Sequence, residues 1–452
     1  MTGIPFAFPP CGPVQGFRTS SVVRYTGIPY ATAARFEVPQ PTADWTSVFQ
    51  ADSPCPACPQ PTGKGSALVA SVPLLQGTGI SEVCQFLSVT VPPTATLTDK
   101  LPVMVWVYGG SFESGAGDSP IYDPSRLVAE HQVIVVNINY RLNIFGFLGD
   151  GEKRPANLGL LDQLEALRWV RRYIPAFGGT DDPKSITFFG QSAGGSSVAD
   201  LMAVPGAPAL FGRAIIQSAP FGLTRGRDEL NSHLLKKAKS ASRDMTVAEM
   251  IELCEKIDKA GSKKAPKGEM PFAPQYGYAP LPAEADLNAA LNTNAPLIDM
   301  LVGSTDSEAS LFLPFFSVVG VAIDAPIVGK SIHNHSVSKL NNTIYHPYDR
   351  TFAERHVLAG GKASLYRIKF SNKTNRLGAC HTIDLPLLFG NKEVYDGAKI
   401  LEGFSPEQID LAGEQMRAIW ADFAKGKQVH LTDSVLGLIE IAEIVDLSKR
   451  SI

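Results

Sequence analysis

One serine of this chain lies between two glycines, in a pattern that suits a nucleophile. The stretch reads Gly190-Gln191-Ser192-Ala193-Gly194. A serine hydroxyl attacks a carbonyl carbon only when a base takes its proton, an acid orients that base, and hydrogen-bond donors stabilise the oxyanion. The nucleophile interpretation therefore requires these groups elsewhere in the sequence. The alternative is a serine in an ordinary glycine-rich turn.

The residues around Ser192 predict the sharp strand-to-helix turn on which such a nucleophile lies in α/β-hydrolases. Residues 185–189 (SITFF) predict a strand that leads directly into the glycine pattern, and residues from Ser196 onward can continue as a helix. The flanking positions of this turn are glycine because a Cβ there would collide with the neighbouring strand and helix. The helix N-terminus would also direct its N–H groups and positive dipole end at the site.

Apolar strands alternate with helical patterns along the chain, which predicts an α/β fold with a mostly parallel sheet covered by helices on both faces. The strands are expected at residues 102–108, 133–139, 185–189, 213–217, 298–303 and 364–370, and the helices at 157–173, 247–259 and 411–425. We expect a single domain over residues 1–452. A helical insertion is expected around residues 225–297, where a Lys-, Ala- and Ser-rich stretch precedes a proline-rich one.

The other catalytic groups should follow the ends of the predicted strands. Glycines after the strand at 102–108 let backbone N–H groups approach a substrate oxygen, so Gly110, Ser111 and Ala193 are the expected oxyanion donors. The loop after the strand at 298–303 carries two carboxylates, Asp306 and Glu308. Of the histidines beyond that loop, His381 follows the strand at 364–370 by a short loop. His381 is therefore the candidate base, because this fold orders its triad as serine, acid, histidine.

Composition and charge exclude several other classes of protein. A net charge of −3 without a polybasic run argues against a nucleic-acid partner. The apolar stretch 312–329 contains Asp324 and two prolines and barely reaches the roughly 20 residues of a membrane span, so we interpret it as buried core or pocket lining. The pair Cys55 and Cys58 has CxxC spacing, but no second pair completes a metal site, and we expect no metal or cofactor.

Motifs along nearly the whole chain resemble those of the type-B carboxylesterase and cholinesterase family, of the bacterial or fungal type. They stand in family order: TGIPYA with ARFEVPQP, CPQ, SEVCQFLSV, VWVYGGSFESG, NYRLNIFGFL, NLGLLDQLEALRWVRRYIPAFGG, FFGQSAGG, LFGRAIIQSA, GACHTIDLPLLFG and IWADFAKG. The resemblance implies an α/β-hydrolase fold. It also implies a serine carboxylesterase with a Ser-Glu-His triad that hydrolyses small-molecule esters without a cofactor.

Carried over residue by residue, the resemblance implies Ser192 as nucleophile and His381 as general base. The family's acid is a glutamate five residues after a glycine, which counts from Gly303 to Glu308. Here the aspartate stands one position early, at Asp306, and Ala309 replaces a glycine. We favour Glu308 over Asp306 as the acid.

Two departures from the family pattern bear on substrate choice. Ser111 replaces the third oxyanion glycine and crowds the pocket, and Gln191 replaces the glutamate that often precedes the nucleophile. Loss of that negative charge near His381 favours neutral esters over choline-like ones. The chain is also short for the family, so we expect a shallow, open pocket. The expected pocket lining is Phe112, Phe189, Phe221, Phe312, Phe315, Phe316 and Leu388, any of which could instead be core.

Several further points concern the cysteines, the oligomeric state and the alternative functions. The family pairs the cysteines that correspond to Cys58 and Cys84. The N-terminus shows no signal peptide, so we expect a cytoplasmic location, and there the sequence favours neither the disulfide nor free thiols. Cys380, beside His381, lacks a nucleophile turn and is expected to be a packing residue. The protein is expected to be a monomer or homodimer with no membrane partner. A carbamate or aryl-amide hydrolase with the same triad is the alternative function, and a non-catalytic cholinesterase-like binding module is a remote one.

Overall fold

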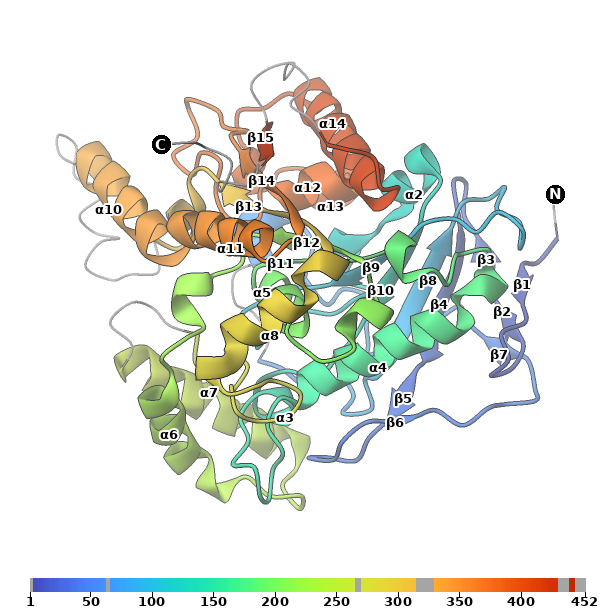
Figure 1. Ribbon diagram of the computed structural model, residues 1–452, viewed down its shortest axis with the longest axis horizontal. Helices are drawn as coiled ribbons and strands as arrows, with labels where there is room; N and C mark the ends of the chain where they lie inside the picture. The colour runs from blue at the N-terminus through green and yellow to red at the C-terminus, as the bar shows by residue number, and fades with distance from the viewer. Residues whose placement is uncertain (1–2, 62–65, 265–269, 314–328, 430–438, 444–452) are drawn as a thin grey trace.

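Ten strands of the described residues form one central sheet (Figure 1). The computed structural model describes residues 3–61, 66–264, 270–313, 329–429 and 439–443. The strand order across the sheet is β15-β14-β13-β12-β11-β9-β10-β8-β4-β3. The strands are β3 (Phe17–Arg18), β4 (Val23–Pro29), β8 (Phe86–Val91), β9 (Val103–Val107), β10 (Ile134–Ile138), β11 (Ile186–Gln191), β12 (Arg213–Gln217), β13 (Asp299–Thr305), β14 (Lys362–Ile368) and β15 (Ile439–Glu443).

The middle of this sheet is parallel, from β10 through β9, β11, β12 and β13 to β14, and antiparallel strands flank it on both sides. After β9 the chain goes to β10 on one side, and it then returns to form β11 on the other side. The strand order therefore reverses at β9, and ligands of open α/β sheets bind beside the carboxyl ends of strands at such a switch point. The residues that follow β9 and β11 both lie there.

Helices cover both faces of the sheet (Figure 1). Helix α5 packs against β9, β11 and β12 and contacts α4, α11 packs against β13 and β14, and α14 packs against α2 and α12. The main helices are α2 (Ser125–His131), α4 (Leu158–Tyr173), α5 (Ala193–Leu201), α6 (Asp228–Lys237), α7 (Val247–Lys264), α8 (Leu287–Asn294), α10 (Gly329–Ile344), α11 (His346–Leu358), α12 (Asp384–Phe389) and α14 (Pro406–Ala424). Short helical elements include α1 (Ser66–Val69), α3 (Asn143–Gly146), α13 (Lys392–Tyr395), η1 (Pro120–Tyr122) and η9 (Glu308–Leu311).

All six predicted strands and all three predicted helices are present, with bounds that shift by a few residues. The region expected to hold a helical insertion contains α6, α7 and α8, of which α6 and α7 pack on each other. The antiparallel strands β3, β4, β8 and β15 were not predicted. Among the small additional sheets, β1 (Phe6–Ala7), β2 (Val14–Gln15) and β7 (Phe49–Gln50) form one, and β5 (Ala31–Thr32) and β6 (Gln40–Pro41) another.

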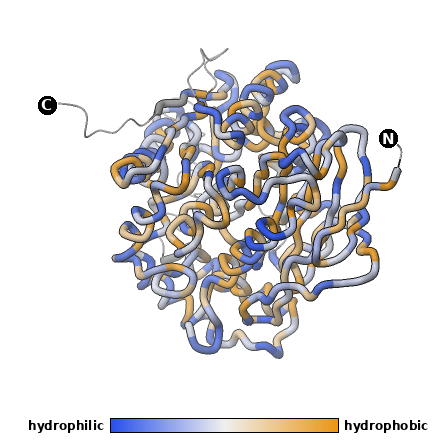
Figure 2. The backbone as a smooth tube through the Cα atoms, turned by 45° about the vertical axis from the view of Figure 1, so that its right-hand side comes forward, coloured by the Kyte–Doolittle hydropathy of each residue, from blue (hydrophilic) through white to orange (hydrophobic). Residues whose placement is uncertain are grey.

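The core lies on both faces of the parallel strands. Every residue of β9, β10 and β11 is buried, as the unbroken apolar runs of β9 and β10 indicated. Trp106 of β9 has its ring centroid 4.9 Å from that of Phe189 and 5.0 Å from that of Phe389, so it joins the sheet to α12. Hydrophilic segments lie mainly at the periphery (Figure 2). No helix in the described part of the chain is long and apolar enough to cross a membrane, and most of the stretch 312–329 lies outside the described residues.

A buried ion pair fixes the loop after β10 to α4. The Arg141 guanidinium donates from Nε to Asp162 Oδ2 at 2.8 Å and from Nη2 to Oδ1 at 2.7 Å, and both side chains are at most 4% exposed. Removal of one partner leaves an uncompensated buried charge, which costs about 3–5 kcal/mol.

We therefore expect Asp162→Ala to lower the free energy of unfolding by about 3–5 kcal/mol, because Arg141 loses its counterion. Denaturant titration followed by circular dichroism measures this loss. The solvent-exposed pair of Glu252 and Lys256 on α7 is the control, and Glu252→Ala should cost less than about 1 kcal/mol. Equal losses in the two variants would contradict a special role for the buried pair.

Candidate active site

Ser192 occupies a strained turn between β11 and α5. Its φ of 58° and ψ of −125° lie in a region that side-chain-bearing residues rarely adopt. The Ser192 N–H donates to the Gln217 carbonyl at 2.8 Å, which ties the turn to the next strand. A Cβ on Gly190 would lie 2.6 Å from the Val107 carbonyl oxygen and 2.7 Å from the Gly194 carbonyl carbon. The turn therefore requires glycine at position 190, as the sequence pattern predicted.

The loop after β9 lies beside Ser192. A Cβ on Gly109 would approach the Ser192 Cβ to 2.9 Å, so the two loops are in direct contact. Gly110 and Ser111 have φ values of 114° and 58°, and both line a cavity together with Ser192. Ala193 is the first residue of α5, and an N–H at that position has no acceptor within its own helix. The three expected oxyanion donors thus lie at the ends of β9 and β11.

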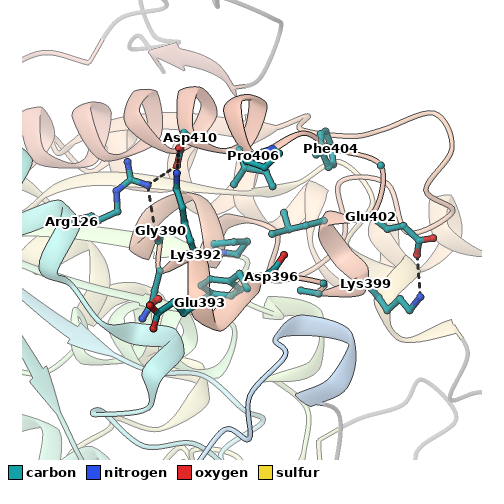
Figure 3. Close-up of a pocket in the computed structure, with 18 residues that line it drawn as sticks. Arg126, Gly390, Lys392, Glu393, Asp396, Lys399, Glu402, Phe404, Pro406 and Asp410 are labelled. Atoms are coloured by element: carbon teal, nitrogen blue, oxygen red, sulfur yellow. Dashed lines mark hydrogen bonds and ion pairs between the residues drawn. The ribbon is translucent and has the colours of Figure 1, made fainter.

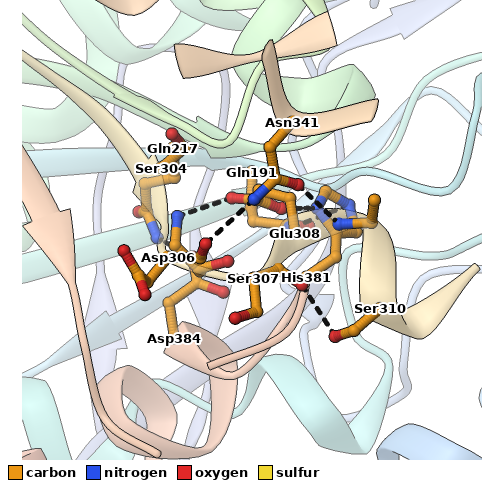
Figure 4. A network of polar contacts seen from close by, with 12 residues as sticks. Gln191, Gln217, Ser304, Asp306, Ser307, Glu308, Ser310, Asn341, His381 and Asp384 are labelled. Atoms are coloured by element: carbon orange, nitrogen blue, oxygen red, sulfur yellow. Dashed lines mark hydrogen bonds and ion pairs between the residues drawn. The ribbon is translucent and has the colours of Figure 1, made fainter. Parts of the chain in front are cut away.

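Glu308 and His381 form a buried hydrogen bond (Figure 4). Glu308 begins η9 after β13, and its Oε2 contacts His381 Nδ1. The other carboxylate oxygen, Oε1, accepts the Thr305 N–H at 2.6 Å. Glu308 is fully buried and His381 is 3% exposed, whereas the alternative acid, Asp306, is exposed. The structure therefore brings Glu308, and not Asp306, to the imidazole.

The charge on Glu308 is stabilised inside the protein. Burial alone would raise the pKa of this carboxyl, but His381 and the hydrogen bonds from Ser218 and Thr305 outweigh burial and hold its pKa below the ordinary value. A second carboxyl, Asp384, lies close enough to interact with Glu308, and burial raises its pKa to about 6. The Gln217 amide donates to Asp384 Oδ2 at 2.6 Å. Of the two acids, Glu308 is the one whose charged form the surroundings favour, because its pKa is lowered whereas that of Asp384 is raised.

The other ring nitrogen of His381 faces the residue before Ser192. The Gln191 side-chain nitrogen, Nε2, lies 3.1 Å from His381 Nε2. Gln191 is 2% exposed and lines the same cavity as Ser192 and His381. Gln191, which replaces the family's glutamate, therefore places an amide directly against the ring nitrogen that faces away from Glu308.

The cavity at Ser192 has a volume of about 170 Å³ and a mainly apolar wall. Among the expected lining residues, Phe312 contributes to it, and its ring centroid lies 5.1 Å from that of His381. Sequence reasoning missed the other wall residues, which come from segments far from Ser192 in the chain: Val69, Ala70, Val72, Leu74, Ile121, Tyr122, Leu311, Thr382 and Leu385.

Four other expected lining residues pack elsewhere. Phe112 lies against Phe147, with ring centroids 4.5 Å apart, and Phe189 packs on Trp106. Phe221 stacks on Phe352 at 4.8 Å, and Leu388 is fully buried in α12. These side chains contribute to the core and do not line the cavity. Phe315 and Phe316 lie outside the described residues.

The six cysteines are all described, and each is a buried free thiol. Cys58 and Cys84 are neighbours but are not joined, and the Leu142 N–H lies 3.3 Å from Cys58 Sγ. Burial raises the pKa of the Cys380 thiol far above its ordinary value, which fits a packing role. Within the described ranges, no cluster of three or more His, Cys, Asp or Glu side chains could hold a metal ion.

A second, larger cavity of about 600 Å³ lies between α12, α13 and α14 (Figure 3). Aromatic and aliphatic side chains such as Tyr395, Leu401 and Phe404 line it. Asp410 pairs there with both Arg126, at 2.8 Å, and Lys392. None of the triad candidates lines this cavity, so its size does not make it the reaction site.

This fold and site belong to a known class of hydrolase. A family model described as "Carboxylesterase family" matches residues 5–342, so the chain belongs to the carboxylesterase family. It is therefore a carboxylic-ester hydrolase with the α/β-hydrolase fold, as the resemblance implied.

Individual relatives match the sequence of this chain along almost its full length. Para-nitrobenzyl esterase of Bacillus subtilis is 32% identical over 451 residues, which cover 92% of this chain and 88% of that one. Probable N-octanoylanthranilate hydrolase AqdA2 of Rhodococcus erythropolis is 33% identical over 427 residues, covering 92% and 91%. A solved structure titled thermophylic PNB esterase superposes with a TM-score of 0.80 at 27% identity, covering 99% of each chain.

The geometry distinguishes the two acids in the loop after β13. We expect Glu308→Gln to lower kcat about 10³- to 10⁴-fold, because an amide at this position no longer stabilises the imidazolium and favours the wrong tautomer. Asp306→Asn should retain activity within about twofold, since its side chain is exposed. Steady-state hydrolysis of p-nitrophenyl butyrate measures both, with circular dichroism as the folding control. An inactive Asp306→Asn beside an active Glu308→Gln would reverse the assignment.

Proposed function

We propose that this chain hydrolyses neutral carboxylic esters through an acyl-serine intermediate, with Ser192 as nucleophile, His381 as general base and Glu308 as the acid that orients it. The observation that carries the proposal is the hydrogen bond between Glu308 and His381 Nδ1 at the wall of the cavity that holds the strained Ser192. A triad is recognised by such geometry and roles, whatever the fold.

In the proposed reaction, His381 Nε2 takes the proton of the Ser192 hydroxyl while Oγ attacks the ester carbonyl. The backbone N–H groups of Gly110, Ser111 and Ala193 stabilise the oxyanion, and one such donor typically lowers the barrier by about 3 kcal/mol. The imidazolium then protonates the leaving alcohol, which departs and leaves the acyl group on Ser192. A water molecule repeats the sequence, the acid is released, and Ser192 recovers its proton.

A neutral substrate with a compact reacting group fits the cavity best. Its wall carries no acidic side chain in the described part of the chain, and Gln191 supplies an amide where a carboxylate would attract a cation. Ser111 adds a side chain beside the proposed oxyanion site. A volume of about 170 Å³ is below the range of roughly 300–1,000 Å³ typical of drug-sized ligands, so large acyl groups require widening.

A carbamate or aryl-amide hydrolase is the second candidate, because the same triad and oxyanion donors serve all three bonds. Two relatives carry names that favour it: AqdA2, the probable N-octanoylanthranilate hydrolase, and phenmedipham hydrolase of Pseudarthrobacter oxydans, which is 27% identical and covers 93% of this chain. The mainly apolar cavity wall is compatible with either leaving group. The bond that is cleaved fastest decides between the candidates.

We also propose a single domain over residues 1–452 with its helical insertion around 225–297, in a cytoplasmic monomer or homodimer. One sheet that includes both the early strand β3 and the late strand β15 supports a single domain. Six free thiols support a reducing compartment. Size-exclusion chromatography with light scattering measures the oligomeric state.

The test is hydrolysis of matched p-nitrophenyl butyrate, p-nitrophenyl carbamate and p-nitroanilide substrates by wild type and Ser192→Ala. We expect the wild type to prefer the ester in kcat/KM and to release a burst of p-nitrophenol equal to the enzyme concentration. Ser192→Ala should lose the burst and at least about 10³-fold in kcat. Full activity of folded Ser192→Ala would refute the proposed nucleophile, and a preference for the carbamate or anilide would select the second candidate.

A further inference from the structure

The proton-accepting nitrogen of the candidate base already has a hydrogen-bond partner. Glu308 contacts His381 Nδ1, so Nε2 is the ring nitrogen left to receive the Ser192 proton. The atom 3.1 Å from Nε2 is the side-chain nitrogen of Gln191. Gln191 is the last residue of β11 and is bonded directly to Ser192, so the two residues approach the same imidazole from adjacent positions.

Hydrogen-bonding capacity assigns the direction of this contact. A neutral imidazole has one N–H donor and one acceptor nitrogen. The Glu308 carboxylate accepts from Nδ1, which places the proton there and the lone pair on Nε2. An amide nitrogen is only a donor, so the Gln191 NH₂ group donates to that lone pair. Glu308 and Gln191 thus hold the ring from opposite sides in a single tautomer.

The surroundings of Gln191 leave its amide room to reach the ring. Gln191 is 2% exposed, so a hydrogen bond from its amide has little competition from water. A Cβ on Gly109 would lie 3.3 Å from the Gln191 Oε1 and 2.5 Å from its backbone oxygen. Glycine at position 109 therefore makes space for the amide as well as for the approach of the two loops.

We infer that Gln191 is a positioning residue that caps the Nε2 lone pair of His381 in the resting site and releases it to the Ser192 hydroxyl when an ester binds. The inference rests on the proposed function and deepens it. The amide N–H can be accepted only by the neutral ring, because protonation of Nε2 removes its lone pair. Gln191 consequently extends the activity of the site toward acid pH, and it opposes deprotonation of Ser192 until the ester is in place.

Among the described residues, the other charged and titratable groups around His381 make contacts different from this one. Glu308 in η9 holds Nδ1, and Asp384 in α12 interacts with His381 at longer range while its Oδ2 accepts from Gln217. The Tyr345 ring, just before α11, lies 5.9 Å from the imidazole, and the Cys380 thiol is the chain neighbour. A substitution at Gln191 therefore changes the contact at Nε2 and leaves the contacts of these other groups in place.

The test compares the pH dependence of kcat/KM for p-nitrophenyl butyrate in wild type, Gln191→Met and Gln191→Glu. Methionine has a similar length but no donor, so the acid limb should move to higher pH by about half a unit. A carboxylate favours the protonated ring, so Gln191→Glu should move the limb by more than one unit. Gln163→Met is the matched control, because Gln163 is a buried amide that donates to Ser197 and not to His381. Its acid limb should coincide with that of the wild type.

Three results separate the possibilities. Coincident acid limbs for wild type and Gln191→Met overturn the inference, and so does a uniform loss of activity at all pH values. If Gln191→Met does not fold, Gln191→Asn replaces it, since the shorter amide does not reach Nε2 and predicts the same shift. Ser192→Ala is assayed in parallel: an active Ser192→Ala refutes the proposed function itself, whereas an inactive one beside an unshifted Gln191→Met refutes only the inference.

Discussion

The close approach of two strand ends is the constraint on which the site depends. The loop after β9 and the turn after β11 are packed so tightly that Gly109 and Gly190 have no room for side chains. That contact holds the strained Ser192 beside Gly110 and Ser111, which line the same cavity. The strain is stable because β11 is hydrogen-bonded between β9 and β12, and because the Ser192 N–H is held by Gln217.

Neighbouring strands add the remaining groups at the same edge of the sheet. Glu308 follows β13, His381 follows β14, and the two meet because parallel strands end on one side. Burial would neutralise an isolated carboxyl, yet hydrogen bonds from His381 and Thr305 keep Glu308 charged. The strand ends and the buried charge therefore fix one imidazole. Glu308 contacts its Nδ1, and the Gln191 amide faces its Nε2.

The sequence predicted the parallel strands and the residues that follow them, because both rest on local signals. Unbroken apolar runs marked β9 and β10, and glycines marked the turns at Gly110 and Ser192. Glu308 was favoured over Asp306 because the resemblance to the family's glutamate pattern counts from Gly303 to Glu308, and the burial of Glu308 agrees with that choice. The catalytic roles of these residues stay predictions.

The cavity wall was beyond sequence reasoning, because long-range packing creates it. Ala70 and Val72 line the cavity with Ser192, and the Ser71 N–H between them donates to the Val394 carbonyl at 2.9 Å, which holds their segment in place. Ile121 is held by the Tyr395 hydroxyl, which donates to its carbonyl at 2.7 Å. Conversely, Phe189 was expected to line the pocket. Its strand, β11, is buried on both faces, so the Phe189 side chain packs in the core against Trp106. Strand β4 was missed because Gly27 and Pro29 interrupt its pattern and its register shifts between Tyr25 and Ile28.

The most direct test of an acyl-serine mechanism is the site of covalent labelling by diethyl p-nitrophenyl phosphate, read by intact mass and peptide mapping. We expect one diethylphosphoryl group per chain on the peptide that contains Ser192, with parallel loss of esterase activity. Ser192→Ala should take up none. Stoichiometric labelling of another residue, or full inactivation of the wild type without modification of Ser192, would contradict it.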